Sequence, residues 1–316
     1  MLRVLSLFSG IGAFEKALTR LGIPFELVGY SEIDKYASKA YSLIHNVSEN
    51  LNLGDITKVD ETKLQDFDLM TYGFPCQDIS IVGQQRGITK ETRSGLVYDA
   101  LRIAKYKKPK YMIAENVEAI ISNKFKNQFE QILCELNKIG YNNYWKLIDS
   151  SEIIPQQRKR VFIVSIRKDI DNKNFNFIFD IKKQYTNFYD FLDNQVDDKY
   201  IKLNIFNNKL KYKNFTYNDL SIIKLIDNGE RISHRQDGLI YTLTASGRNC
   251  GSNQYICNLG RVLTPQECFR FMGFDKADCE ICIQNGISDT QLYKMVGNSI
   301  VVNILEYIFK NLFIKY

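Results

Sequence analysis

Residues 2–21 read LRVLSLFSGIGAFEKALTRL, and this stretch decides the fold class. The apolar run 3–8 predicts a buried strand, and the amphipathic pattern of 12–21 predicts a helix directly after it. Between them, the segment Phe8-Ser-Gly10-Ile-Gly12 places glycines where a chain turns sharply and approaches a ligand closely. A strand, a glycine turn and a helix in this order predict an α/β domain of Rossmann-like type.

The same alternation continues through the first half of the chain. Further strands are predicted at residues 25–30, 67–72, 111–114, 144–148 and 161–166, and helices at 35–44, 96–105 and 127–139. Short apolar runs that alternate with helical patterns are typical of a parallel sheet covered by helices. We therefore predict a parallel α/β sheet in this half.

The composition changes after about residue 167. Residues 171–258 are rich in Asn, Lys, Phe and Tyr and show no clean alternation, and helical patterns return at 265–272, 289–296 and 300–313. Such a shift marks a second, smaller domain or a long insertion. We predict a ligand-binding catalytic domain over residues 1–183, a smaller irregular domain over 184–286, and C-terminal helices over 287–316 that return to the first domain.

Composition and charge exclude several classes of protein. With 45% hydrophobic and 25% charged residues, the 316-residue chain is neither disordered nor membrane-embedded, and no apolar run approaches the roughly 18 residues of a spanning helix. The net charge of +6 permits a polyanionic partner without demanding one. An odd count of seven cysteines without a secretion signal indicates a reducing compartment, and we expect a cytoplasmic protein.

A CxxC pair, Cys279 and Cys282, raises the question of a metal site. Cys257 and Cys268 precede it, but the second close pair of a strong zinc signature is missing. We favour buried, unligated thiols and predict no metal.

The glycine loop favours a nucleoside over a dinucleotide. The third glycine of the phosphate-binding pattern is replaced by Glu15, whose charge would repel a pyrophosphate. Glu32 follows Gly12 by 20 residues at the end of the second strand, where a carboxylate can accept hydrogen bonds from ribose hydroxyls. Asp55 can do the same for an adenine amino group. The alternative is a plain strand–helix turn with surface acids; the three features together favour an adenosyl ligand.

Three further groups lie at the ends of strands of the same predicted sheet. Cys76 lies in Gly73-Phe-Pro-Cys-Gln77 after one strand, Glu115 ends another, and Arg158 and Arg160 precede a third. Separately, each has an unremarkable interpretation: an inert thiol, a solvated acid and a basic start of a strand. A thiol, a carboxylate and an arginine pair at strand ends of one sheet indicate a catalytic site.

At this point the chain resembles a known family. Over essentially its whole length it is similar to bacterial and phage cytosine-C5 DNA methyltransferases of the restriction-modification type. The matching motifs occur in the family's order: Phe8–Gly12, Glu32, Asp55, Gly73–Gln77 with Ser80, Glu115–Val117, Gln156–Arg160, Arg261–Glu267 with Arg270 and Gly273-Phe274, and Gly297-Asn298-Ser299. The segments PCQ, ENV, QxRxR and GNS in this spacing carry the resemblance.

The resemblance implies a reaction and its catalytic residues. The methyl group of S-adenosylmethionine would pass to C5 of a cytosine within a specific short duplex DNA sequence, after the base is flipped out of the helix. Cys76 would attack C6 as the nucleophile, and Glu115 would hydrogen-bond the base. Arg158, and through it Arg160, would brace the base and the catalytic loop.

The resemblance also implies binding residues. The cofactor pocket would comprise Phe8, Gly10, Ile11, Gly12, Glu32, Ile33, Asp55, Ile56, Pro75, Leu96, Asn298 and Ser299. Many relatives carry an aromatic residue where Ile33 stands. DNA would be contacted by Ser80, Arg86 and Arg93 in a mobile loop, and by Asn228, Arg231 and Thr244 in a target-recognition domain. We expect a monomer, without membrane contact, that has a cognate restriction endonuclease as a possible functional partner.

Competing interpretations are a transfer-RNA methyltransferase of the same fold, a catalytically silent DNA-binding relative, and a nicotinamide enzyme. The RNA-acting subgroup carries a Cys-Phe-Thr signature that is absent here. A catalytically silent relative is disfavoured because every matched catalytic position is filled. A nicotinamide enzyme is disfavoured by the glycine pattern. The sequence does not give the DNA recognition sequence, and it does not distinguish a bacterial from a phage origin.

Overall fold

The computed structural model describes residues 1–75, 87–88, 92–178, 185–202, 218–226, 231–245 and 253–314. The chain forms two compact units, each discontinuous in sequence. Unit 1 comprises Met1–Ile148, Lys159–Phe179 and Leu305–Tyr316, and unit 2 comprises Asp149–Arg158 and Asp180–Ile304. The chain therefore passes between the units four times, at 148/149, 158/159, 179/180 and 304/305.

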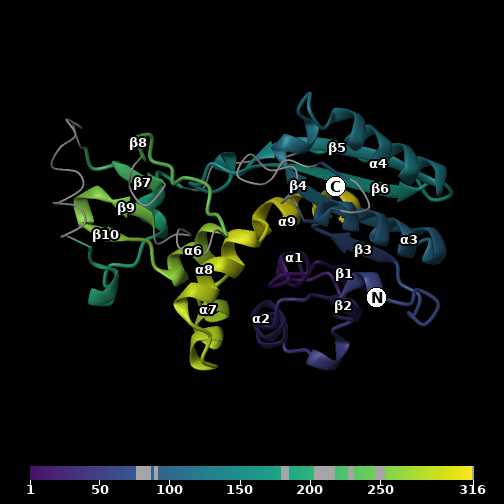
Figure 1. Cartoon of the computed structure of the whole chain (residues 1–316), viewed down its shortest axis with the longest axis horizontal. Coiled ribbons are helices and arrows are strands. Elements are labelled where there is room, and N and C mark those ends of the chain that lie inside the picture. The colour runs from purple at the N-terminus through teal and green to yellow at the C-terminus, as the bar shows by residue number, and fades with distance from the viewer. Residues whose placement is uncertain are drawn as a thin grey trace. The chain divides into compact units, whose positions relative to one another are not determined.

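Unit 1 is built on a six-stranded sheet in the order β2-β1-β3-β4-β6-β5 (Figure 1). The strands are β1 Leu2–Leu7, β2 Phe25–Ser31, β3 Leu69–Tyr72, β4 Tyr111–Val117, β5 Tyr141–Asp149 and β6 Lys159–Arg167. Strands β2, β1, β3 and β4 pair in parallel, whereas β6 pairs antiparallel with β4. The predicted α/β class is confirmed, but the expectation of an all-parallel sheet is wrong at β6.

Helices cover both faces of this sheet. They are α1 Ala13–Arg20, α2 Lys35–His45, α3 Val97–Lys107, α4 Lys126–Lys138 and, across the boundary of the two units, α9 Val302–Phe313. Leu5 and Leu7 of β1 join the buried core formed with α3 and α4. Ser6 points to the opposite face because side chains alternate along a strand, and there Phe14 of α1 packs edge-to-face against Phe309 of α9.

Unit 2 contains a second sheet that the sequence did not predict. Its order is β10-β9-β7-β8, with the strands β7 Ile222–Ile226, β8 Arg231–Arg235, β9 Gln254–Ile256 and β10 Arg261–Val262. The pairings of β10 with β9, of β7 with β8 and of β7 with β9 are antiparallel. Helices α6 Pro265–Phe271, α7 Lys276–Gln284 and α8 Asp289–Asn298 follow, and α7 was also not predicted. The strands are short and irregularly spaced, so their period of two is weak in the sequence.

Short 3-10 helices connect these elements. They are η1 Glu49–Leu51, η2 Ile56–Lys58, η3 Arg93–Leu96, η4 Glu118–Ile121, η5 Ser150–Glu152, η6 Phe188–Phe191, η7 Asp198–Tyr200 and η10 Cys257–Leu259.

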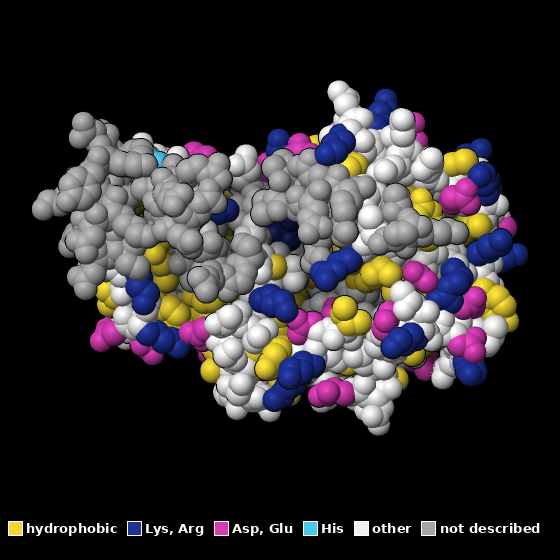
Figure 2. All heavy atoms as spheres, in the orientation of Figure 1, with side chains coloured by type: hydrophobic (Ala, Val, Ile, Leu, Met, Phe, Trp, Pro, Cys, Tyr) yellow, Lys and Arg dark blue, Asp and Glu magenta, His cyan; other side chains and the backbone are white. Residues whose placement is uncertain are grey.

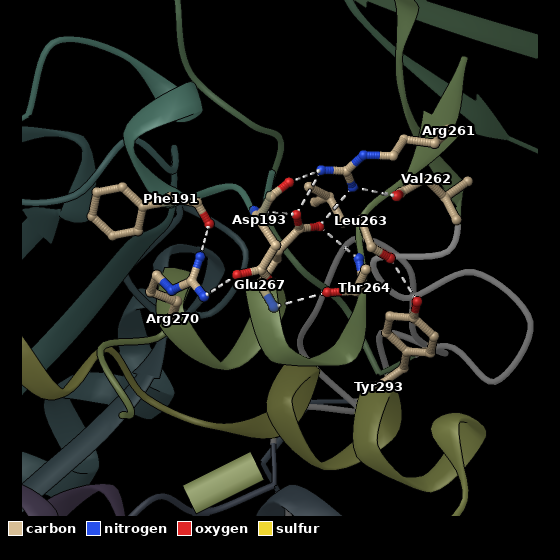
Figure 3. A network of polar contacts seen from close by, with 9 residues as sticks. All are labelled: Phe191, Asp193, Arg261, Val262, Leu263, Thr264, Glu267, Arg270 and Tyr293. Carbon is tan, nitrogen blue, oxygen red and sulfur yellow. Dashed lines mark hydrogen bonds and ion pairs between the residues drawn. The ribbon is translucent and has the colours of Figure 1, made fainter. Parts of the chain in front are cut away.

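A buried ion pair fixes the start of α6 in unit 2 (Figure 3). Thr264 and Glu267 form a capping box, and Arg261 donates to both carboxylate oxygens of Glu267 at 2.9 and 2.7 Å. Arg270 donates to Asp193 at 2.8 Å and to the carbonyl of Phe191. This network joins β10, α6 and the segment after η6, so it stabilises the scaffold of unit 2.

The surface and the cysteines add little to a search for function. In Figure 2, Lys and Arg side chains are interspersed with Asp and Glu over the described part of the visible face. Within the described residues no helix is long and apolar enough to cross the bilayer, and no group of three or more His, Cys, Asp or Glu could hold a metal ion. Cys279 and Cys282 form no disulfide, and both are buried on α7.

Candidate active site

The glycine loop after β1 depends on backbone conformations that favour glycine. Phe8, Gly10 and Gly12 have φ values of 54°, 55° and 78°. A Cβ built on Gly12 would lie 2.0 Å from His45 Nε2, whereas no described atom lies within 4 Å of a Cβ built on Gly10. Gly12 is therefore required for packing against α2, and Gly10 faces open space that a ligand can fill.

Glu32 follows β2 beside this loop. Its Oε2 accepts a hydrogen bond from Gly10 N at 2.9 Å, and its Oε1 accepts one from Asp34 N at 2.8 Å. Burial raises the pKa of this carboxyl above its ordinary value, and the backbone donors oppose that rise. Asp34 caps α2 by accepting from Tyr36 N and Ala37 N. The carboxylate is thus held in one orientation beside the glycine loop.

Asp55 and Ile33 lie on the loops that follow. Asp55 caps η2, and its Oδ1 accepts from Thr57 N at 3.0 Å and from Thr57 Oγ1 at 2.8 Å, which together lower its pKa. Ile33 is 78% exposed, so its apolar side chain is accessible to a ligand beside Glu32. The side chains of Ile11 and Ile56 are buried in the core. A ligand contact from these two residues would therefore come from their backbones.

Glu15 does not lie where the sequence interpretation put it. It is only 1% exposed, on the inward side of the first turn of α1, and it interacts with Ser6 and Tyr41. Burial raises the pKa of its carboxyl to about 7. The expectation that Glu15 confronts a ligand and repels a pyrophosphate is wrong, because the side chain turns into the core.

The segment that leads to Cys76 is anchored to β4. Phe74 is buried, and its carbonyl accepts a hydrogen bond of 3.0 Å from Asn116 Nδ2. Asn116 is itself buried, and its Oδ1 accepts from Val117 N at 2.8 Å. The described range that contains Phe74 ends at Pro75, and the next begins at residue 87. Cys76, Ser80 and Arg86 therefore lie outside the described residues.

Glu115 and Arg160 form an ion pair at the sheet edge. Arg160 Nε lies 2.9 Å from Glu115 Oε1, and the two side chains are 16% and 12% exposed. They are neighbours because β6 is antiparallel to β4: Val117 is in register with Arg160, and Glu115 with Phe162. The start of β6 thereby reaches the same edge as the carboxyl ends of the parallel strands, where ligands of such sheets bind.

Arg158, two residues earlier, makes different contacts. Its guanidinium donates to the carbonyls of Leu243, Gly297 and Ser299 at 2.7, 3.2 and 2.6 Å, and the side chain is buried within unit 2. The resemblance implied that Arg158 braces the base. In the structure its donors are directed at main-chain carbonyls, so we assign it the positioning of these two segments.

Two buried glutamines to which the sequence analysis gave no role hold the same part of unit 2. Gln156 accepts from Leu243 N at 3.0 Å and donates to Phe271 O at 2.8 Å. Gln254 pairs with both backbone groups of Tyr241 at 2.9 and 3.0 Å. Gln156 lies in the motif QQRKR, which was a signal of importance but not of role. No sequence signal marked Gln254.

The other predicted site residues are divided between the units. Leu96 packs partly buried against the core of unit 1, at the end of η3, and Arg93 begins η3 with an exposed side chain. In unit 2, Asn298 is exposed and Ser299 is buried at the end of α8. Backbone atoms of Thr244 lie 2.3 and 2.4 Å from a Cβ built on Gly297. Arg231 begins β8, and Asn228 lies outside the described residues.

Fold and site together define the class of protein. A glycine loop, an oriented carboxylate and a glutamate–arginine pair at one edge of a parallel-rich sheet define a Rossmann-like methyltransferase. The model of the family C-5 cytosine-specific DNA methylase matches residues 2–314, and the chain belongs to this family. It is a DNA (cytosine-5-)-methyltransferase.

Similar proteins come from phages and bacteria. The chain is 31% identical to Orphan methyltransferase M.SPRI of Bacillus phage SPR, over 100% of this chain and 98% of the relative. It is 34% identical to Type II methyltransferase M2.ScrFI of Lactococcus lactis subsp. cremoris, over 99% of each. The crystal structure of the S. pombe Dnmt2 methyltransferase is similar, with a TM-score of 0.72 and 20% identity, over 98% of this chain and 97% of that one. At that identity the likeness concerns the fold alone.

Proposed function

We propose that this methyltransferase acts on one cytosine within a short sequence of duplex DNA, with S-adenosylmethionine as methyl donor and Cys76 as nucleophile. The observation that carries the proposal is the Glu115–Arg160 pair at the edge where the glycine loop and the chain leading to Cys76 meet. Relatives named as type II and orphan methyltransferases support the choice of DNA.

The residues present fit an adenosyl ligand. Gly10 leaves open space above the loop, Glu32 offers a carboxylate with about four acceptor positions, and Ile33 offers an exposed apolar side chain. Glu32 would accept the ribose hydroxyls, and Ile33 and Asp55 would face the adenine. When bound, S-adenosylmethionine supplies an electrophilic methyl carbon.

The catalytic residues would act in sequence on a base that has been flipped out of the duplex. The Cys76 thiolate adds to C6 of cytosine, and the electron pair of the 5,6 double bond becomes available at C5. Glu115, as a protonated carboxyl, donates its O–H to N3 and accepts from the amino group with its other oxygen, and transfer of that proton to N3 offsets the negative charge that the thiolate brings to the ring. Arg160 holds the Glu115 side chain in place for this contact.

The ring is restored in two bond changes. After C5 has taken the methyl group and S-adenosylhomocysteine has formed, a base removes the C5 proton. The electron pair of that C–H bond then reforms the 5,6 double bond as Sγ of Cys76 leaves C6. The thiolate is regenerated, so the enzyme turns over.

DNA contacts are proposed for both units. Ser80, Arg86 and Arg93 would contact phosphates beside the site, and Asn228, Arg231 and Thr244 would contact the recognition sequence. Replacement of Arg231 should then alter sequence preference, and unchanged preference would remove Arg231 from the set.

A covalent trap tests this proposal. Duplex oligonucleotides with 5-fluorocytosine at the target, mapped first by bisulfite sequencing of DNA from expressing cells, should form a stable adduct with the wild-type protein and S-adenosylmethionine. The Cys76→Ser variant should form none. Methyl label transferred from tritiated donor to RNA but not to DNA would overturn the choice of substrate. An adduct that persists in Cys76→Ser would overturn the choice of nucleophile.

A further inference from the structure

The side-chain amide of Asn52 joins the two loops that flank the proposed adenosyl site. Its Oδ1 accepts from Glu32 N at 3.1 Å and from Gly54 N at 2.9 Å. Its Nδ2 donates to Glu32 O at 2.9 Å and to Ser38 Oγ at 3.0 Å. All four hydrogen-bonding positions of one amide are thus used, and three of the partners are backbone groups.

These partners leave the amide only one orientation. Two backbone N–H groups face Oδ1, and a flipped amide would place its own N–H donors against them. Glu32 is therefore bound at both its N–H and its carbonyl by the residue that also binds Gly54, which directly precedes Asp55. The amide sets the spacing between the carboxylate assigned to the ribose and the loop assigned to the adenine.

A second layer of hydrogen bonds supports Asn52 from beneath. Ser38 Oγ, which accepts from Asn52, is 3.0 Å from Tyr30 OH. The Tyr30 ring is fully buried and stacks on Tyr41 with centroids 4.1 Å apart. The contacts run from the core through Tyr30 and Ser38 to Asn52, so the position of the Asn52 amide depends on buried side chains of the core.

The backbone of the loop has its own attachments. Leu53 N donates to Tyr30 O at 2.6 Å, and Ser31 Oγ donates to Gly54 O at 2.6 Å. Loss of the Asn52 side chain would therefore leave the loop attached to β2. The expected consequence is a local shift of Glu32 and Gly54 rather than unfolding.

We propose that Asn52 is a positioning residue for the adenosyl group, which fixes the Glu32 carboxylate and the Gly54–Asp55 loop at the distance that one nucleoside spans. The inference rests on the proposed use of S-adenosylmethionine. Asn52 itself touches neither the methyl donor nor the base, so it acts on affinity for the cofactor and not on the chemical step.

Titration calorimetry with S-adenosylhomocysteine, together with steady-state kinetics, tests this inference. Asn52→Ala should raise the Kd for S-adenosylhomocysteine and the KM for S-adenosylmethionine about tenfold, since several hydrogen bonds that orient the loops are lost. The kcat at saturating cofactor and the Kd for DNA should stay within about twofold of wild type, as expected when only uniform binding is removed. Ser38→Ala should have a smaller effect and Tyr30→Phe the smallest.

Asn50→Ala is the matched control, because Asn50 is exposed in the preceding η1 and outside this network. It should leave both constants unchanged. Wild-type affinity for S-adenosylhomocysteine in Asn52→Ala would overturn the inference, and so would a loss of kcat and DNA affinity equal to the loss of cofactor affinity. Failure of the wild-type protein to bind S-adenosylhomocysteine would instead overturn the proposed function.

Discussion

Each unit of the molecule contains an arginine–glutamate pair, and the two pairs differ in how completely the glutamate is enclosed. In unit 2, Glu267 is fully buried and accepts from Arg261 twice, from Thr264 N and from Asp193 N (Figure 3). In unit 1, Glu115 lies 12% exposed at the sheet edge, with Arg160 Nε at 2.9 Å. The two residue types are the same, but the surroundings are not.

The difference separates a structural pair from a catalytic one. Glu267 caps a helix, bonds with both oxygens to groups of its own unit, and lies where no substrate can reach. Glu115 ends a strand at the edge where ligands of such sheets bind, and its partner comes from a strand of opposite direction. Replacement of each residue should therefore alter a different property, and the following predictions test this from the largest effect to the smallest.

Replacement Glu267→Gln should have the largest effect on stability. It leaves the Arg261 charge buried without a counter-charge, and we expect the free energy of unfolding to fall by about 3–5 kcal/mol. Urea denaturation followed by circular dichroism measures the change. The double variant Arg261→Met, Glu267→Leu should recover most of the loss, because a buried pair can be replaced by apolar side chains. A single variant as stable as wild type would contradict the structural role.

Replacement Glu115→Gln should affect catalysis and leave the fold intact. The amide keeps the shape but has no acidic proton to give to N3, and we expect kcat to fall about 10²–10³-fold. The Kd for S-adenosylhomocysteine and the melting temperature should match wild type. In unit 2 the apolar double variant should recover stability. In unit 1 the simultaneous replacement of Arg160 and Glu115 by apolar residues should not restore activity. A kcat close to wild type in Glu115→Gln would remove Glu115 from the mechanism.

Glu15 predicts a dependence of stability on pH. Its pKa in the folded protein is about 7, whereas the ordinary pKa of a glutamate side chain is 4.5. The ionised form is thus disfavoured in the fold, so the penalty is absent at low pH and grows as the pH rises between these values. Glu15→Gln should be more stable than wild type by up to about 3 kcal/mol at pH 8, and the difference should shrink towards pH 5. Paired urea denaturation at the two pH values measures this, and a pH-independent difference would contradict it.

The smallest effect is expected for Arg158→Lys. The lysine ammonium group cannot reproduce the planar guanidinium of Arg158, which donates to three carbonyls. We expect the free energy of unfolding to fall by about 1–2 kcal/mol. Hydrogen exchange should accelerate at residues 240–245, whose backbone is held by Gln156 and Arg158. If exchange there were unchanged while kcat collapsed, Arg158 would belong with Glu115 in the catalytic site.

The fold of unit 1 could be predicted from the sequence because its signals are local. Apolar runs of strand length, amphipathic helices and the glycines of residues 8–12 each act over a few residues, and the structure places a strand or helix at each predicted segment of that unit. The sequence analysis missed the sheet of unit 2 and helix α7. The strands of that sheet are two to five residues long and gain their stability from long-range pairing, which no local pattern records.

The sequence by itself determined the family, the order of the motifs and the residue types that the chemistry requires. Tertiary structure alone decided which partner each residue has. The antiparallel course of β6 gives Glu115 its arginine, the burial of α1 turns Glu15 inward, and Arg158 bonds carbonyls as many as 141 residues away. The physical reason is that backbone conformation follows from neighbours along the chain, whereas hydrogen-bond partners and burial depend on segments that meet only after folding.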